Sequence, residues 1–350
     1  MKIQFGFLWL LLCSVLHANT TNNNNSTTNT AKTILKPLAT FIAHEAAVSD
    51  VCFDQQGRKI ASAGNDGSIR IWDVAQTKPL QTLLGHQAVI NDITFNTKGD
   101  LLASASNDGT VKIWNTKTGR LLQSIDNPTH KSYYNAVNFV LFDTEGKYIF
   151  FGGKNQAISK ALIHTGEITS VYVGKDIVQC AKWLDEQGKM VFAAGKSIYF
   201  LDTQSGEINH SLNVPNDYIK QLSLSKDGET LFTWANSGKI YIWNTRTQTI
   251  VKQWQAGDYG NGGIDFCGKN QVVISGNTGN SVKLWDMGKN EPIHQATKHE
   301  QKVNTLHYHG ASQLLITGSH DGTLKLWLLT QADTTKKDTK NILKGLKGNV

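Results

Sequence analysis

Short apolar runs alternate with turn residues along most of the chain. Residues 48–53, 60–63 and 69–74 are rich in apolar and β-branched side chains, which is typical of short, half-buried strands. Glycine-containing turns at 56–57 and 65–67 separate these runs. The same alternation of apolar runs and turns recurs further along the chain. No stretch of the repeat region has the 3.6-residue period of a convincing amphipathic helix. The pattern therefore predicts an all-β domain built from many short strands.

A tryptophan ends many of these units at a regular spacing. Trp72 and Trp114 are 42 residues apart, and the same spacing separates Trp243, Trp285 and Trp327. The interval of 129 residues between Trp114 and Trp243 is close to three periods, so it should hold two degenerate units. Aligning the turns places Ala161 and Leu201 at the tryptophan positions of those two units. A fixed period of this length predicts a repeat architecture with seven units.

The Trp-Asp repeats resemble the WD40 family, and the resemblance covers roughly residues 38 to 330. It implies a seven-bladed β-propeller whose blades are four-stranded and antiparallel. In this family each repeat runs from the outer strand of one blade into the next blade. Residues 37–43 resemble residues 79–85 and precede the first repeat. The resemblance therefore implies that they supply the outer strand of the last blade and close the ring.

Three repeats carry the same four polar or aromatic residues in the same spacing. Serine or threonine precedes tryptophan by ten residues, and aspartate precedes it by six. Because the set occurs three times, we reject a catalytic triad, which needs one special site. The family resemblance implies instead a buried hydrogen-bond relay. The three sets are His44, Ser62, Asp66 and Trp72; His86, Ser104, Asp108 and Trp114; and His299, Thr317, Asp321 and Trp327.

The resemblance also implies a partner-binding rim at one face of the ring, around the mouth of the channel. Asparagines and tyrosines gather at the corresponding positions, and tyrosine offers a large, stiff contact area with a polar tip. Some of these tyrosines could equally pack only their own loops. The candidate rim residues are Asn65, Asn91, Asn107, Tyr133, Tyr134, Tyr218, Lys220, Tyr259, Lys302, Asn304 and His320.

The two ends of the chain differ from the repeats in composition. Residues 1–18 hold a lysine, an apolar run and a small residue at the end, which predicts a signal peptide cleaved after Ala18. An uncleaved anchor is the alternative. Residues 19–36 are rich in asparagine and threonine and predict a disordered linker. The propeller is expected over 37–331, and the lysine-containing residues 332–350 predict a disordered tail, with a membrane or acidic-partner contact as the alternative. We therefore expect export to a periplasmic or secreted location, assuming a bacterial host, without stable membrane insertion.

The charge, the cysteines and the histidines limit which kinds of binding site the protein could contain. The formal net charge of +7 falls to about +3 once the signal and the tail are set aside, which does not suit a nucleic-acid binder. Cys52, Cys180 and Cys267 fall in apolar segments of different repeats and are expected to be free core residues. His307 and His309 share one strand face, but two imidazoles alone do not make a metal site. No cofactor and no metal is predicted.

These observations favour a non-catalytic, monomeric ring that acts as a scaffold for protein partners. Two alternatives stay open. One is a small-ligand or glycan sensor of the cell envelope, since tyrosines and asparagines can stack on and bind sugars. The other is an enzyme subunit with a site at the channel mouth, although no unique nucleophile–base or carboxylate pair supports it.

Overall fold

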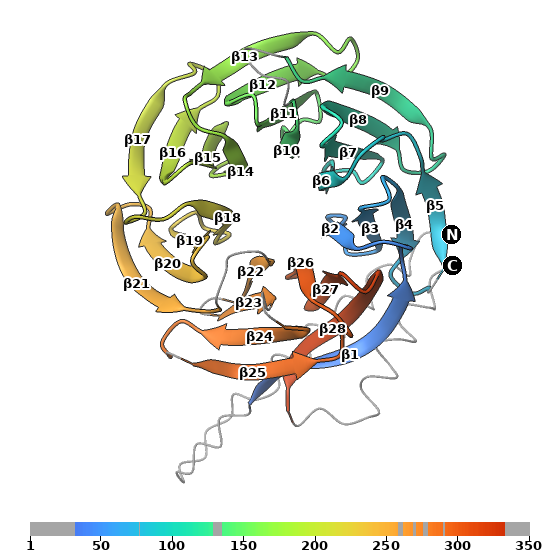
Figure 1. Ribbon diagram of the computed structural model, residues 1–350, viewed down its shortest axis with the longest axis vertical. Coiled ribbons are helices and arrows are strands. Elements are labelled where there is room, and N and C mark those ends of the chain that lie inside the picture. The colour runs from blue at the N-terminus through green and yellow to red at the C-terminus, as the bar shows by residue number, and fades with distance from the viewer. Residues whose placement is uncertain are drawn as a thin grey trace, which may run out of the picture. The chain divides into compact units, whose positions relative to one another are not determined.

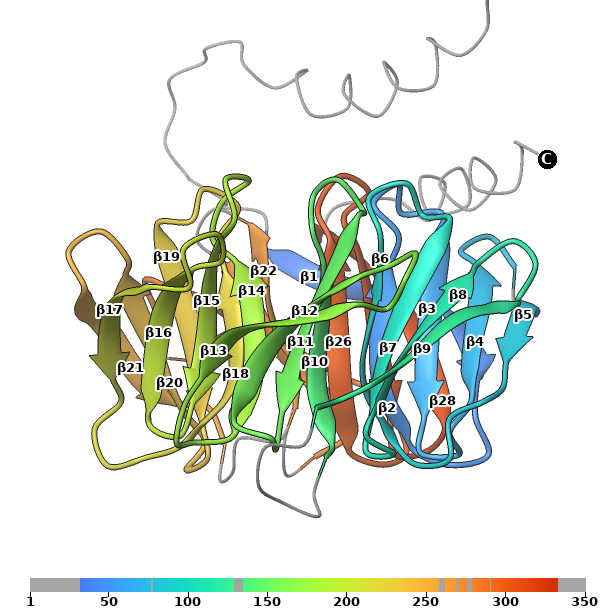
Figure 2. The ribbon, with the colours of Figure 1, turned by 90° about the horizontal axis from the view of Figure 1, so that it is seen from above.

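The fold is a ring of seven blades. The computed structural model describes residues 32–332 apart from 77, 129–134, 258–261, 269–270, 276–278 and 290. The described residues form 28 strands in seven four-stranded antiparallel sheets (Figure 1). Seen from the side, the blades stand next to one another around the ring (Figure 2). The expected fold class is confirmed, and no helix long and apolar enough to span a membrane occurs in the described part of the chain.

Each blade is built from consecutive strands, except the one that joins the two ends. The innermost strands of blades one to seven are β2 (Val48–Phe53), β6 (Ile90–Phe95), β10 (Val137–Phe142), β14 (Val178–Trp183), β18 (Ile219–Leu224), β22 (Ile264–Gly268) and β26 (Val303–His309). The second strands are β3 (Lys59–Gly64), β7 (Leu101–Ser106), β11 (Tyr148–Gly153), β15 (Lys189–Ala194), β19 (Thr230–Ala235), β23 (Gln271–Ser275) and β27 (Leu314–Ser319).

The outer half of each blade holds the third and fourth strands. The third strands are β4 (Ile69–Asp73), β8 (Thr110–Asn115), β12 (Ala157–Leu162), β16 (Ser197–Asp202), β20 (Lys239–Asn244), β24 (Ser281–Asp286) and β28 (Thr323–Gln331). The outer strands are β5 (Pro79–Leu83), β9 (Leu121–Asp126), β13 (Ile168–Val173), β17 (Ile208–Asn213), β21 (Thr249–Gln255), β25 (Pro292–Thr297) and β1 (Thr33–Ile42).

Strand register confirms that the two degenerate repeats are true blades. In blade one, Trp72 of β4 pairs with Ile60 of β3. Ala161 of β12 pairs with Ile149 in blade three, and Leu201 of β16 pairs with Met190 in blade four. The same strand position therefore carries tryptophan in some blades and a smaller apolar residue in others.

The N-terminal strand closes the ring, as the resemblance implied. β1 pairs antiparallel with β28, and Pro37 lies opposite Trp327. The strand begins at Thr33 rather than at Pro37, because β28 extends to Gln331 and offers pairing partners for the additional residues. The outer strand of blade seven thus comes from the start of the described chain and its other three strands from the end, and β1 covers the edge of β28 that would otherwise be unpaired.

The hydrophobic core lies between blades as well as within them. Trp72 of blade one packs edge-on against Phe41 of β1, with 5.4 Å between ring centroids. Both rings are almost completely buried, together with Leu326 of blade seven. Each blade therefore depends on its neighbours to bury its faces, which is the general property of repeat folds.

Two kinds of connection lie at the same end of the ring because the strands are antiparallel. One is the loop from an outer strand to the next inner strand, and the other is the turn between the second and third strands. Backbone hydrogen bonds join them, as where Asn65 N–H donates to Ala47 O at 2.9 Å and His320 N–H donates to Lys302 O at 2.8 Å. We call this end the histidine face, because its loops carry His44, His86 and His299.

Candidate functional site

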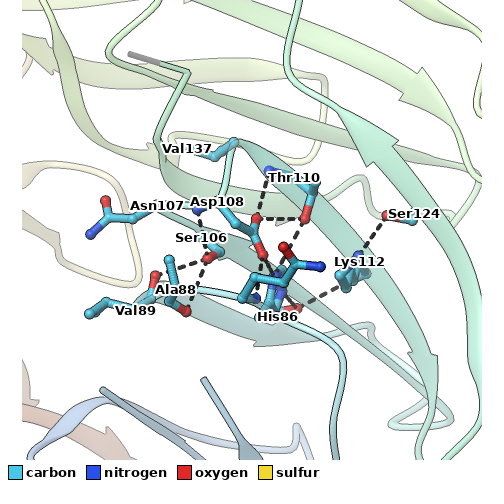
Figure 3. Close-up of polar contacts among 12 residues, drawn as sticks. His86, Ala88, Val89, Ser106, Asn107, Asp108, Thr110, Lys112, Ser124 and Val137 are labelled. Carbon is cyan, nitrogen blue, oxygen red and sulfur yellow. Dashed lines mark hydrogen bonds and ion pairs between the residues drawn. The ribbon is translucent and has the colours of Figure 1, made fainter. Parts of the chain in front are cut away.

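The four residues shared by three repeats meet in one hydrogen-bonded chain in each blade. In blade two, His86 Nδ1 lies 2.7 Å from Asp108 Oδ2, and His86 Nε2 lies 2.7 Å from Ser104 Oγ. Trp114 Nε1 donates to the same Ser104 Oγ at 2.9 Å. Figure 3 shows His86 beside Asp108, whose other oxygen accepts from Thr110. The relay thus joins an outer loop, a turn and two strands.

Blades one and seven repeat this geometry closely. His44 lies 2.9 Å from Ser62 Oγ and 3.2 Å from Asp66, and Trp72 Nε1 donates to Ser62 at 3.0 Å. The corresponding distances in blade seven are 2.8 Å from His299 to Thr317, 3.2 Å from His299 to Asp321 and 2.9 Å from Trp327 to Thr317.

The polarity of the relay follows from its partners. A carboxylate only accepts, so the histidine Nδ1–H donates to it, and Nε2 is left to accept from the hydroxyl. A serine protease uses the same order of bonds. Here, however, Ser62, Ser104 and Thr317 are 0% exposed. Their oxygens also accept from tryptophan, so a substrate carbonyl cannot reach them in the folded ring.

Burial sets the protonation states of the relay. It lowers the pKa of His299 to about 4, against the opposing effect of the Asp321 carboxylate, and it also lowers the pKa of His44. Burial alone would raise the pKa of Asp321, but hydrogen bonds from Thr323 and from the Glu300 N–H bring it to about 2. At neutral pH the pair is therefore a neutral imidazole bonded to a carboxylate.

Blade three replaces the histidine–aspartate bond with a pair of buried asparagines. Asn155 stands six residues before Ala161, at the aspartate position, and its Nδ2 donates to Asn127 Oδ1 at 2.8 Å. Blade five keeps part of the relay, with Trp243 Nε1 donating to Thr233 Oγ1 at 3.0 Å. Ser237 takes the aspartate position in blade five, where its backbone N–H donates to Asp217.

Two of the candidate rim residues hold neighbouring blades together. Asn91 is the extra residue of a β-bulge in β6, and its Nδ2 donates to Val137 O of blade three at 2.8 Å. Asn304 holds the same bulge position in β26 and donates to Val48 O of blade one at 2.9 Å. Asn138 of β10 makes the same bond to the following blade. A bulge turns its extra side chain away from the sheet, which explains why these amides reach across.

The other candidate rim residues differ in exposure. Asn65, Asn107 and His320 are exposed at the histidine face, and Asn107 Oδ1 accepts from Asn91 Nδ2. Lys302 is half-buried, which lowers its pKa. Tyr218 is 56% exposed, and Lys220 lines the channel. Tyr133, Tyr134 and Tyr259 lie outside the described residues.

The central channel is lined by polar side chains that clamp the inner strands. It encloses about 550 Å³, and all seven inner strands contribute to its wall. Asp50 accepts the Ile93 N–H of blade two at 2.9 Å and the Thr305 hydroxyl of blade seven at 2.9 Å. Asp92 accepts the Val140 N–H of blade three at 2.8 Å. These carboxyls therefore link successive blades through backbone groups.

Burial perturbs the channel carboxyls. It raises the pKa of Asp50, and burial together with the Asp50 carboxylate raises the pKa of Asp92 to about 8. Lys182 opposes both shifts from β14. The arrangement holds a proton on the Asp50–Asp92 pair at neutral pH, since two adjacent carboxylates resist ionising together.

The cysteines and the paired histidines of β26 have structural contacts. Cys52, Cys180 and Cys267 are free, and burial raises the pKa of the Cys180 thiol to about 12. His307 Nδ1 accepts the Phe53 N–H at 3.1 Å, and His309 Nε2 donates to Gln55 O at 3.1 Å. Within the described residues, no three His, Cys, Asp or Glu side chains gather as metal ligands would.

Sequence reasoning missed the channel carboxyls and an aromatic cluster between blades three and four. Phe192 lies 4.9 Å from the Tyr172 ring and 5.1 Å from the Tyr199 ring, centroid to centroid. Lys160 Nζ lies 4.2 Å from the centre of the Tyr148 ring. Lys160 stands where blade one carries the buried Ile71. This departure from the repeat pattern was the sequence feature that could have pointed to the cluster.

Three stretches of the chain match the WD40 family model, described as "WD domain, G-beta repeat", at residues 35–73, 77–115 and 290–327. These stretches end in blades one, two and seven, which are the blades with complete relays. The fold defines a seven-bladed β-propeller. Its WD40 repeats at these three positions make the chain similar to WD40 propellers, which commonly serve as protein-interaction scaffolds.

Proposed function

We propose that this propeller is a non-catalytic scaffold that binds protein partners through its histidine face. The observation that supports the proposal is the threefold occurrence of a buried hydroxyl–imidazole–carboxylate relay. Chemistry at one site would leave one set distinct and open, whereas these three sets are alike and closed. Around them the same face exposes Asn65, Asn107, Tyr218 and His320, which contribute little to the relay itself.

The test compares cross-linked partner capture by two variants in the native host. One variant carries Asn65→Ala, Tyr218→Ala and His320→Ala on the histidine face. The matched control carries Lys98→Ala and Lys117→Ala, which are exposed in turns at the opposite end of the ring. We expect a protein captured by the wild type to be lost in the first variant and kept in the control, at equal melting temperatures. Capture that survives in both variants would contradict the proposed binding face.

A second experiment tests the absence of catalysis. A fluorophosphonate probe labels an activated serine, because it requires an accessible hydroxyl next to a general base. We expect no labelling of the folded protein, since Ser62 and Ser104 are inaccessible. Stoichiometric labelling that is lost in Ser104→Ala would show an open catalytic site and overturn the proposal.

We also propose that the scaffold acts outside the cytoplasm, in the periplasm or after secretion. The support is the apolar run and small residue within residues 1–18, which lie outside the described residues. Mass spectrometry of the protein purified from its host should find a first residue of Asn19. Recovery of the peptide that begins with Met1 would argue against cleavage.

A further inference from the structure

On the histidine face, blades four and five differ from blades one and three at one position just before the inner strand. This position is the loop residue directly before the first, buried aliphatic residue of each inner strand. In blades one and three that loop residue is a buried alanine, Ala47 at 6% and Ala136 at 4% exposure. In blades four and five it is Ile177, 37% exposed, and Tyr218, 56% exposed. Large apolar side chains thus replace buried alanines at one register position.

These side chains belong to a patch that runs from the end of blade three to blade five. Val173, the last residue of β13 in blade three, is 60% exposed and leads into the loop that carries Ile177. The next contact is between Asp176 of this loop and the Gly195 turn, where a Cβ would meet the aspartate at 2.9 Å. Lys196 of that turn lies over the Tyr218 ring at 5.5 Å. Loops and turns therefore form one surface from Val173 to Tyr218, in neighbouring blades of Figure 1.

Lysines surround this apolar surface. Lys175 and Lys196 are exposed on it and Lys220 lines the channel beside it, and among the described residues no salt bridge involves any of the three. Asp176, on the same loop as Lys175, is also exposed. Lys220 holds the bulge position that carries a clamping asparagine in blades two, three and seven. The carboxylate of Asp217 accepts the backbone N–H groups of Tyr218 and Ser237. Among these residues three lysines face two aspartates, so the patch carries a net positive charge.

We infer that this patch on blades four and five docks an acidic segment of a partner protein that also carries aromatic or aliphatic side chains. Exposed apolar side chains supply the contact area, and the lysine ammonium groups select carboxylates and steer the encounter. The chain's own tail is excluded by charge, because residues 332–350 contain five lysines and two aspartates. The inference rests on the proposed function and adds the chemistry of the partner and the blades that bind it.

An array of random decapeptides probed with the full chain tests this inference. We expect bound sequences to be enriched in Asp or Glu beside Phe, Tyr or Leu, with binding that weakens as salt rises. Lys175→Glu with Lys196→Glu should raise the Kd of the best peptide about tenfold or more. Tyr218→Ala should weaken it without changing its salt dependence. The control Lys98→Glu with Lys117→Glu, which alters charge equally at the opposite end, should leave the Kd unchanged.

The outcomes separate this inference from the proposed function. No acidic–apolar enrichment, or an equal loss in the control pair, would overturn the inference. Partner capture that depends on Asn65 and His320 but survives both Tyr218→Ala and the lysine reversal would also overturn it, while the scaffold proposal would stand. Loss of the captured partner on reversal of Lys175 and Lys196 alone would support both.

Discussion

Blades one, two and seven pack around a buried histidine relay, whereas blades three and four lack this relay and pack mainly with aromatic and aliphatic side chains. In blade one the large ring comes from the third strand as Trp72, and Ser62 on the second strand receives its N–H. In blade three the ring comes from the second strand, because Phe151 takes the hydroxyl position and Ala161 takes the tryptophan position. A large ring from the second strand thus stands in for a large ring from the third, and core substitutions that conserve volume are those a fold tolerates best.

The two kinds of blade packing should lose stability in different ways when one side chain is removed. A relay contains buried donors and acceptors, so removing one member leaves another without a partner. The aromatic packing in blades three and four contains fewer buried donors and acceptors that need a partner. Its stability depends instead on large rings that fill the space between blades. Just before the inner strand, blade one keeps the buried Ala47, whereas blades four and five expose Ile177 and Tyr218. Blades four and five therefore offer apolar side chains for recognition at a position where blade one offers none.

The largest expected effect comes from breaking ring closure on the relay side. Deleting residues 33–42 removes β1, exposes the edge of β28 and uncovers Trp72 and Trp327. We expect loss of a single cooperative thermal transition, measured by calorimetry. A truncated protein that keeps the wild-type melting temperature would show that β1 is not needed for closure.

The next effect tests the aromatic side. Phe192→Ala should reduce the free energy of unfolding by about 3–5 kcal/mol, since it opens a cavity beside Tyr172 and Tyr199. Urea unfolding measures this loss, and Leu122→Ala on the exposed face of β9 serves as a control with little change. A loss below about 1 kcal/mol for Phe192→Ala would mean that the rings do not carry the packing of blade four.

The relay should give a smaller and non-additive effect. His86→Ala and Ser104→Ala should each cost about 1–3 kcal/mol, because each leaves a buried polar group unpaired. The double variant should cost less than the sum of the two, which a double-mutant cycle detects. Strict additivity would indicate that the histidine and the serine do not act as one unit.

The smallest expected effect is a change of stability with pH, which should have opposite signs for the relay histidine and the channel carboxyl. Because the folded pKa of His299 is about 4, below the ordinary 6.5, the unfolded chain binds more protons and stability falls as pH decreases from 6.5 to 4. The folded pKa of Asp92 is about 8, above its ordinary value, so its contribution to stability falls as pH rises from 4 to 8.

Asp92→Asn tests the channel arm of this prediction. The amide oxygen can still accept the Val140 N–H, but no buried charge forms at high pH. We therefore expect a melting temperature a few degrees above wild type at pH 8 and little difference at pH 4. A variant that is less stable than wild type at pH 8 would show that the Asp92 charge stabilises the ring.

Periodicity in the sequence was enough to predict seven repeats, two of them degenerate, and the recurring four-residue sets. The blades and the buried relay were implied by the WD40 resemblance. The spacing of Trp72 and Trp114 carries this information because each repeat must form the same four strands around a shared core. The residues that act between blades could not be predicted in the same way. Asn91 and Asn304 resembled rim residues in sequence, and only the bulges in β6 and β26 turn their amides onto the next blade.

The sequence by itself determined the local units, since strand pattern, turn glycines and the tryptophan period are properties of neighbouring residues. The tertiary structure decided what those units do to one another. It brought Asp50 and Asp92 together in the channel, and it placed Lys196 over Tyr218 on the surface. These contacts join residues from different repeats, and their distances depend on how the ring closes. The sequence pattern indicated which strand closes the ring, but these distances are set only when all seven blades pack together.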